Sequence, residues 1–238
     1  MSSRNLVAFI FARGGSKGIV GKNVKYFCGV PLIERAVRQA KGVAGVERVI
    51  VSTDSEEIAE LALKSGAEIP VLRPDHLSDD KSSEWDAWKH ALEFMQERGE
   101  LPKTMLSLPT TAPLRLCSDI ETCIEVFEKT DSDIVVTITD CSHNPYFNMV
   151  EQAVDDSVCL FSSLPEGRVF RRQDSPRVYG LTTVAYVVDT RFVLDHDSWT
   201  EGLVKGVYIP PERAVDIDTN LDFEIAEFLF SKRGDCSS

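Results

Sequence analysis

The chain has 238 residues, of which 43% are hydrophobic and 27% charged, a composition typical of a globular protein large enough to bury a core. Its formal net charge of -12 argues against nucleic acid and anionic membrane as partners, because like charges repel, but it allows a local basic pocket. No apolar run approaches the roughly 20 residues of a membrane span, the N-terminal stretch does not resemble a signal peptide, and the six cysteines lack zinc-binding spacing. We therefore expect a cytoplasmic protein with reduced thiols.

The first part of the chain alternates between short apolar runs, typical of buried strands, and segments with helical spacing. Asp54 with Glu57 forms a capping-box pattern for the second helix, and Ser118 with Glu121 suggests a cap for the fourth. This alternation predicts an α/β fold with a doubly wound, mainly parallel sheet. Strands are expected at residues 6–11, 48–52, 104–108 and 133–139, and helices at 32–40, 55–65, 84–98 and 118–129.

The pattern breaks at about residues 141–179, which contain "HNPYF" and "SSLPEGRVFRRQDSPRVY". Two short hairpin strands or an extended arm would fit this segment, either as an active-site lid or as a subunit-contact arm. Apolar alternation returns at 184–188 and 203–209, and a helix at 220–230 closes the chain. We expect one domain, residues 1–238, with the segment 141–179 inserted in it.

The loop that follows the first expected strand, "ARGGSKGIVGKN", combines glycines with Arg13, Lys17 and Lys22. Ligands of an open α/β sheet lie beyond the carboxyl ends of its strands, which is where this loop begins. Glycines let backbone N–H groups approach an anion, and the basic side chains add positive charge. The loop fits neither G-x-G-x-x-G nor G-x-x-x-x-G-K-[ST], because Ser16 and Asn23 stand at the first and last positions of the latter. We interpret it as a phosphate-binding loop of another type.

This loop resembles the signature loop of the acylneuraminate cytidylyltransferases, the CMP-sialic acid synthetase family. The likeness continues, in the family's order, through "VIVSTDSEEIAELA", "RPDHLSDDKSS", "PTTAPLR", "RRQDSPRVY" and "VDIDTNLDF", and so covers nearly the whole chain. The resemblance implies a nucleotide-diphospho-sugar transferase-like fold. It also implies an enzyme in which the anomeric hydroxyl of a nine-carbon 2-keto sugar acid attacks the α-phosphate of CTP and releases pyrophosphate. Family members commonly form homodimers in which an arm closes the partner's sugar site.

The resemblance also implies roles for single residues. Lys17 and Lys22 would neutralise charge that builds on the phosphates in the transition state. Arg172, with Gln173 beside it, would face the sugar carboxylate, either within one subunit or across the dimer. The other positions that match nucleotide-binding residues are Arg13, Gly14, Ser16, Asn23, Arg73, Ser83 and Thr111. From the residues alone, the segment at Arg73 is better explained as a polar loop, with Ser82 or Ser83 as the cap of the next helix.

Asp216 and Asp218 flank Ile217 in "VDIDTN". In an extended segment their side chains point the same way, and two carboxylates are suitable ligands for Mg²⁺. Magnesium would bridge triphosphate oxygens there, and Asp218 would share the catalytic role with the two lysines. The spacing alone is equally compatible with Asp216 as a surface charge and with Asp218 or Thr219 as a helix cap. The resemblance favours the metal site.

Some positions depart from the best-known sialic acid enzymes. Pro109 stands where they carry glutamine, Thr182 and Thr183 stand near their Asn-Gly, and Gly180 replaces an arginine. These positions would contact the sugar, so we expect a related bacterial-type nonulosonate, such as a legionaminic or pseudaminic acid derivative, in place of N-acetylneuraminate.

Two other functions stay open at this point. One is a nucleotidyltransferase for another ulosonate, such as 3-deoxy-manno-octulosonate. The other is a non-catalytic nucleotide-binding regulator on the same fold. The regulator predicts lost metal ligands, whereas Asp216 and Asp218 are both present.

Overall fold

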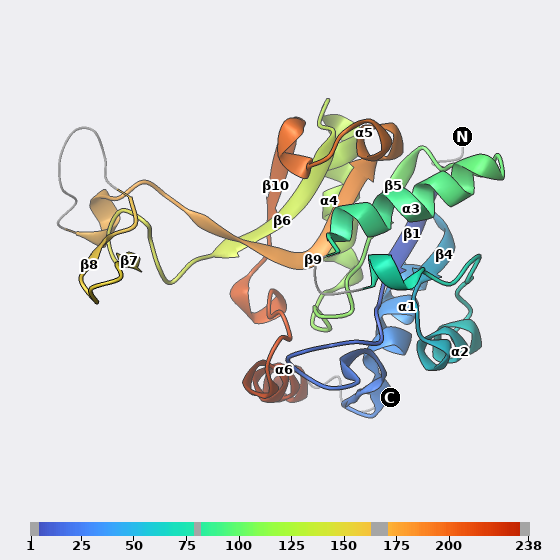
Figure 1. Ribbon diagram of the computed structural model, residues 1–238, viewed down its shortest axis with the longest axis horizontal. Helices are drawn as coiled ribbons and strands as arrows, with labels where there is room; N and C mark the ends of the chain where they lie inside the picture. Colours follow the sequence, from blue (N-terminus) through green and yellow to red (C-terminus); the bar gives the residue numbers. More distant parts are fainter. Residues whose placement is uncertain (1–4, 79–81, 163–170, 234–238) are drawn as a thin grey trace.

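A six-stranded sheet forms the centre of the molecule in a computed structural model that describes residues 5–78, 82–162 and 171–233 (Figure 1). The strand order is β10-β6-β9-β5-β1-β4. β1 pairs in parallel with β4 and β5, and β10 pairs in parallel with β6, whereas β9 runs antiparallel to β5 and β6. The predicted α/β fold with a mainly parallel sheet is confirmed. The strands are β1 (Leu6–Phe11), β4 (Val46–Ser52), β5 (Thr104–Ser107), β6 (Ile134–Asp140), β9 (Tyr179–Asp189) and β10 (Val204–Tyr208).

Helices cover both faces of this sheet. The apolar cluster on one face contains residues of α1, α2 and α4, and the cluster on the other face contains residues of α3 and α5. β1 contributes to both because successive side chains of a strand point to opposite faces: Leu6 and Ile10 join the first cluster, and Val7 and Phe9 join the second. The helices are α1 (Leu32–Gly42), α2 (Glu56–Lys64), α3 (Glu84–Glu97), α4 (Cys117–Lys129), α5 (Thr190–Asp195) and α6 (Asn220–Lys232). None of the helices in the described ranges has the length and hydropathy of a membrane-spanning segment.

Two helix caps differ from the predicted ones. Ser55 caps α2, with its side chain accepting from the Ile58 N–H, so the cap assigned to Asp54 is wrong. The Asp54 carboxylate instead accepts a hydrogen bond from the Gly14 N–H. α4 begins one residue before Ser118, and the Asp119 carboxylate accepts from the Leu116 N–H. Ser118 therefore lies inside the helix, where it cannot cap it.

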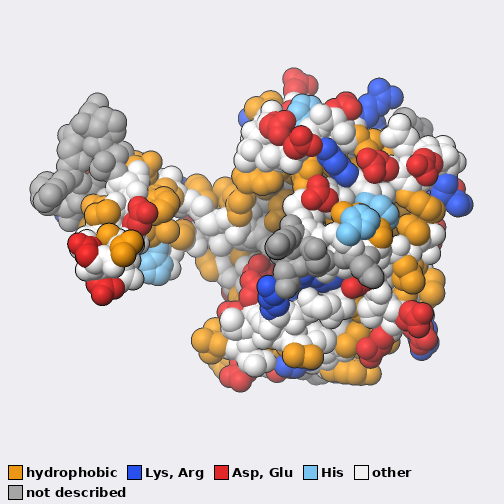
Figure 2. All heavy atoms as spheres, viewed as in Figure 1, with side chains coloured by type: hydrophobic (Ala, Val, Ile, Leu, Met, Phe, Trp, Pro, Cys, Tyr) orange, Lys and Arg blue, Asp and Glu red, His pale blue; other side chains and the backbone are white. Residues whose placement is uncertain are grey.

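The segment between β6 and β9 projects from the body as an arm (Figure 1). It carries an antiparallel hairpin of β7 (Val150–Gln152) and β8 (Val158–Leu160), one of the two forms expected for it, and residues 163–170 lie outside the described ranges. Figure 2 shows hydrophobic side chains on this arm and on the neck that joins it to the body. Two hydrophobic residues of the arm, Val158 and Phe161, are 62% and 61% exposed. A second small hairpin, β2 (Tyr26–Phe27) with β3 (Val30–Pro31), follows the basic loop.

β9 starts earlier than predicted, at Tyr179, and contains a bulge. β6 pairs Val136 with Tyr186 but the next residue, Thr137, with Thr182, so residues 183–185 are left out of the backbone pairing with β6. Such a bulge changes the direction in which the side chains of its strand point. Thr183, one of the bulged residues, lines the cavity described below.

Candidate active site

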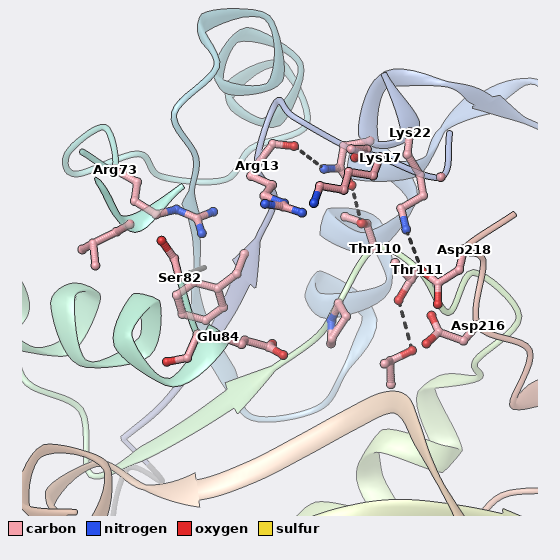
Figure 3. Close-up of a pocket in the computed structure, with 18 residues that line it drawn as sticks. Arg13, Lys17, Lys22, Arg73, Ser82, Glu84, Thr110, Thr111, Asp216 and Asp218 are labelled. Carbon is pink, nitrogen blue, oxygen red and sulfur yellow. Dashed lines mark hydrogen bonds and ion pairs between the residues drawn. The ribbon is translucent and has the colours of Figure 1, made fainter. Parts of the chain in front are cut away.

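A cavity of about 450 Å³ opens at the carboxyl ends of β1 and β5, the edge of the sheet at which a ligand is expected (Figure 3). The loop after β1 supplies most of its basic side chains, and the residues before α3 supply another wall. The loop after β5, the bulge of β9 and the segment before α6 complete it. Predicted site residues that line this cavity are Arg13, Ser16, Lys17, Lys22, Asn23, Arg73, Ser83, Thr111, Asp216 and Asp218.

Asn23 holds the basic loop in place. Its side chain is 5% exposed, and its Nδ2 donates to the carbonyl of Arg13 at 2.8 Å. Its Oδ1 accepts from the hydroxyl of Thr110, which follows β5. Both ends of the buried amide are therefore satisfied by protein groups. This geometry gives Asn23 a role in fixing the loop against β5, in addition to its place in the cavity wall.

Gly14, another predicted binding residue, is not one of the described residues that line the cavity. Its N–H donates to Asp54 Oδ1 at 2.8 Å, which ties the basic loop to the end of β4. Gly18 lies in close contact with the backbone of Asp218. A Cβ atom added at this position would be 1.9 Å from the Asp218 carbonyl oxygen. The basic loop thus rests directly on the backbone of the acidic segment, and only glycine permits this approach.

Arg73 and Ser83 enter the cavity from the side of α3. Arg73 is 7% exposed and donates to the carbonyl of Ser52 at 2.9 Å, and burial lowers its pKa while the charge of Asp54 opposes that shift. The Ser83 side chain accepts from the Asp86 N–H at 3.0 Å and caps α3. Ser83 therefore caps the helix and also lines the cavity, and its role in nucleotide binding stays a prediction.

The two predicted metal ligands face the basic loop (Figure 3). Ile217 is fully buried between them, which turns both carboxylates to one side. Asp218 is paired with Lys22, whose Nζ lies 3.1 Å from its carboxylate and 2.7 Å from the Ile217 carbonyl. Thr219, not Asp218, caps α6.

Asp216 is half-buried, so it is not a surface charge. Burial raises its pKa, and hydrogen bonds from Thr111 and Thr183 oppose that shift. Its Oδ1 is buried without a hydrogen-bond partner in the described part of the chain. A buried carboxylate oxygen without a donor is an unfilled position for a cation or a hydrogen-bond donor.

Arg115, which the sequence did not single out, supports the loop after β5. It is 2% exposed, and its guanidinium donates to the carbonyls of Pro109, Ala112 and Val184. Burial lowers its pKa to about 9, and the charge of Asp216 opposes this. Arg115 ends the quoted "PTTAPLR" motif, so the signal was present, but only the fold shows which carbonyls it meets.

Arg172 and Gln173 lie elsewhere. They line a separate cavity of about 460 Å³ on the arm, together with Asp140, Cys141 and Asn144. Arg172 donates to the Cys141 carbonyl at 3.0 Å. Within one chain these two residues are therefore not brought to the main cavity.

Comparisons with known proteins show the family of this chain. A family model described as "Cytidylyltransferase" matches residues 7–157. The "CMP-N,N'-diacetyllegionaminic acid synthase" of Campylobacter jejuni is 34% identical, over 95% of this chain and 95% of its own. The "Pseudaminic acid cytidylyltransferase" of Campylobacter jejuni is 30% identical, over 94% of this chain and 95% of its own.

A solved structure shares the fold. It is a CMP:2-keto-3-deoxy-manno-octonic acid synthetase complexed with CTP, with a TM-score of 0.71 and 17% identity, and the match covers 96% of this chain and 99% of the other. The resemblance found in the sequence is confirmed by the family model and by the two relatives. The chain belongs to the cytidylyltransferase family.

Proposed function

We propose that this enzyme joins CTP to a 2-keto-3-deoxy nonulosonate and releases a CMP-sugar and pyrophosphate. The observation that carries the proposal is the contact between the basic loop and the acidic pair, with Lys22 Nζ 3.1 Å from Asp218. A cavity that is basic on one wall and acidic on the other suits a triphosphate that arrives with a divalent cation. The names of the relatives at 34% and 30% identity support the CMP-sugar product.

The residues of the basic loop would act on the triphosphate. Arg13, Lys17 and Lys22 line one side of the cavity. Their positive charges would attract the anionic oxygens of the triphosphate. Lys22 is only 13% exposed, so its charge is poorly screened by solvent and would stabilise charge that develops at the reacting phosphate. Asp54 and Asn23 would keep this loop in position through their bonds to its backbone.

Magnesium is part of the proposal. The residues present fit it: Asp216 and Asp218 offer hard oxygen ligands on one side of the chain, and Asp216 Oδ1 is buried without a partner among described residues. The described ranges contain no cluster of three or more histidine, cysteine or acidic residues able to hold a metal. The remaining ligands would be phosphate oxygens and water, as is usual for Mg²⁺. Bound there, the ion would supply charge neutralisation and orient the phosphates.

For the sugar, we propose a legionaminic- or pseudaminic-type acid. Pro109 and Thr183, two of the positions that depart from the sialic acid enzymes, line the cavity, and neither carries an amide. The octulosonate synthetase, at 17% identity, supports only the fold, whereas both sequence relatives are named for nonulosonates. The nonulosonate is therefore the better-supported substrate.

A homodimer and a cytoplasmic location are also proposed. The exposed Val158 and Phe161 of the arm suit a subunit contact, and Arg172 on the same arm would then meet the partner's cavity. Light scattering tests the dimer: a strict monomer with full activity would contradict it.

Pyrophosphate release tests the function. Purified protein is assayed with four nucleoside triphosphates against N,N'-diacetyllegionaminate, a pseudaminate derivative, N-acetylneuraminate and 3-deoxy-manno-octulosonate, with and without Mg²⁺. We expect release with CTP, Mg²⁺ and one of the first two sugars. Best turnover on N-acetylneuraminate would overturn the sugar assignment. Tight CTP binding without release for every sugar would favour the regulator.

A further inference from the structure

A second cavity, of about 330 Å³, adjoins the main one, and both are lined by Ser83 and Glu84. Its other walls are largely aromatic and apolar. The indole rings of Trp85 and Trp88 are 5.3 Å apart, and the ring of Tyr186 packs on Trp88 at 5.6 Å. No lysine or arginine is among its described lining residues, and the carboxylate of Asp197, which also lines it, is paired with Lys89 at 2.6 Å. This second cavity is therefore suited to an uncharged group with an apolar end, and not to a phosphate.

Glu84 stands where the two cavities meet. It is the first residue of α3, and in Figure 3 it extends into the main cavity across from Arg13 and Lys17. Trp88 Nε1 donates to its Oε1 at 3.3 Å, and this is its one hydrogen bond among the described residues. A carboxylate can accept about four hydrogen bonds, so Glu84 has acceptor capacity left for a ligand.

The charge of Glu84 also selects the kind of group that it faces. Its side chain is open to the cavity, but the protein groups around it replace part of its solvent, and this desolvation raises the pKa of Glu84. The charge of Asp216 adds to the shift, while Trp88 and Arg73 oppose it. A carboxylate in this position repels phosphate oxygens and needs a hydrogen-bond donor. The nucleotide's phosphates belong on the opposite, basic wall, so they do not supply this donor. The aromatic cavity beside Glu84 suits an uncharged group with an apolar end, which points to the second substrate as the source of the donor.

We propose that Glu84 is a specificity-determining residue that accepts a hydrogen bond from the N–H of an acylamino substituent on the sugar acid, at the mouth of the second cavity. An acylamino group combines a polar N–H with an apolar end, which matches a carboxylate placed beside an aromatic wall. This inference rests on the proposed function and adds one recognition residue to it.

The test is Glu84→Gln. Trp88 Nε1 needs an acceptor, so the amide oxygen turns to Trp88 and the amide N–H₂ faces the sugar, where it opposes another N–H. We expect kcat/KM for an acylamino sugar, N,N'-diacetyllegionaminate, to fall by about 10- to 100-fold, the effect of losing a hydrogen bond to a charged group. An analogue with a hydroxyl in place of that acylamino group can accept from the new amide and should lose less than about threefold.

Two controls separate the possible causes. Glu97→Gln, at the exposed end of the same helix, should leave kcat/KM unchanged for both the acylamino sugar and the hydroxyl analogue. The Kd of CTP alone, measured by calorimetry, should stay within about twofold in Glu84→Gln. Glu84→Asp keeps the charge but withdraws it by one methylene, and should also lose the acylamino preference.

Three results would overturn the inference while leaving the proposed function intact, provided that the wild type still releases pyrophosphate. They are an equal loss for both sugars, a fall in CTP affinity that matches the fall in kcat/KM, and no change at all. A wild type that is inactive with every sugar overturns the proposed function and this inference together.

Discussion

Gly18→Ala probes the contact between the basic loop and the acidic segment. The added methyl would lie 1.9 Å from the Asp218 carbonyl oxygen, and the clash is with backbone, which cannot rotate away. Cβ atoms do not approach other heavy atoms closer than 3.0 Å, so the loop or the Asp218 segment must move by about 1 Å.

A displacement of this size acts on catalysis more than on folding. Misplacing reacting groups by about 1 Å can cost about 10²-fold in rate, and we expect kcat to fall by that factor. Overpacking typically costs about 1–3 kcal/mol, so the free energy of unfolding should fall by this modest amount. The variant should therefore be folded but slow.

The assay is steady-state pyrophosphate release at saturating CTP and sugar, with urea unfolding of the same preparations. Gly15→Ala is a matched control in the same loop, because its added methyl would meet nothing within 4 Å. The control should keep near wild-type activity. If Gly18→Ala were as active as Gly15→Ala, the contact between the two walls would not set the catalytic geometry, and the reasoning would fail.

Substitutions at three further positions test other contacts. Lys22→Ala should lower kcat by about 10²- to 10³-fold with Mg²⁺ present, and a change confined to KM would contradict its place at the reacting phosphate. Asp54→Ala should raise the KM for CTP about tenfold because the Gly14 N–H loses its partner, whereas Asp54→Asn retains an acceptor and should recover most of the affinity; equal effects would refute the tether. Arg115→Met should lower the free energy of unfolding by about 3 kcal/mol, since buried carbonyls lose their donor, and a loss below about 1 kcal/mol in urea would refute this.

The sheet could be predicted because its strands are apolar runs between helical patterns, and β1 and α1 begin at the predicted residues. β9 was predicted too short because Tyr179 and Gly180 bear no apolar pattern and pair with β6 only in the folded chain. α5 was missed because six residues are too few to show a period.

The caps show a different limit. Asp54 and Ser55 are adjacent and both are favourable N-cap residues, so local sequence cannot choose between them. A distant contact decides: the Gly14 N–H, forty positions away in sequence, engages Asp54 and leaves Ser55 to cap α2.

The candidate site was predicted where one segment supplies several residues, as in the basic loop and the pair Asp216 and Asp218. Glu84 gave no signal, because the sequence shows it only as the first residue of a helix, and the cavity walls that it faces come largely from other elements. The position of Arg172 depends on where the arm lies, which no local pattern specifies.

The path of β9 has a consequence for how this enzyme can be modified. One strand of eleven residues runs from the arm into the body, and it carries Tyr179 at the arm end, Thr183 in the main cavity and Tyr186 in the second cavity. It pairs with β6 on both sides of the bulge at residues 183–185, so a displacement of the arm would reach residues of both cavities through this strand. Any redesign of the arm, including one intended only to alter assembly, is therefore also a redesign of substrate geometry.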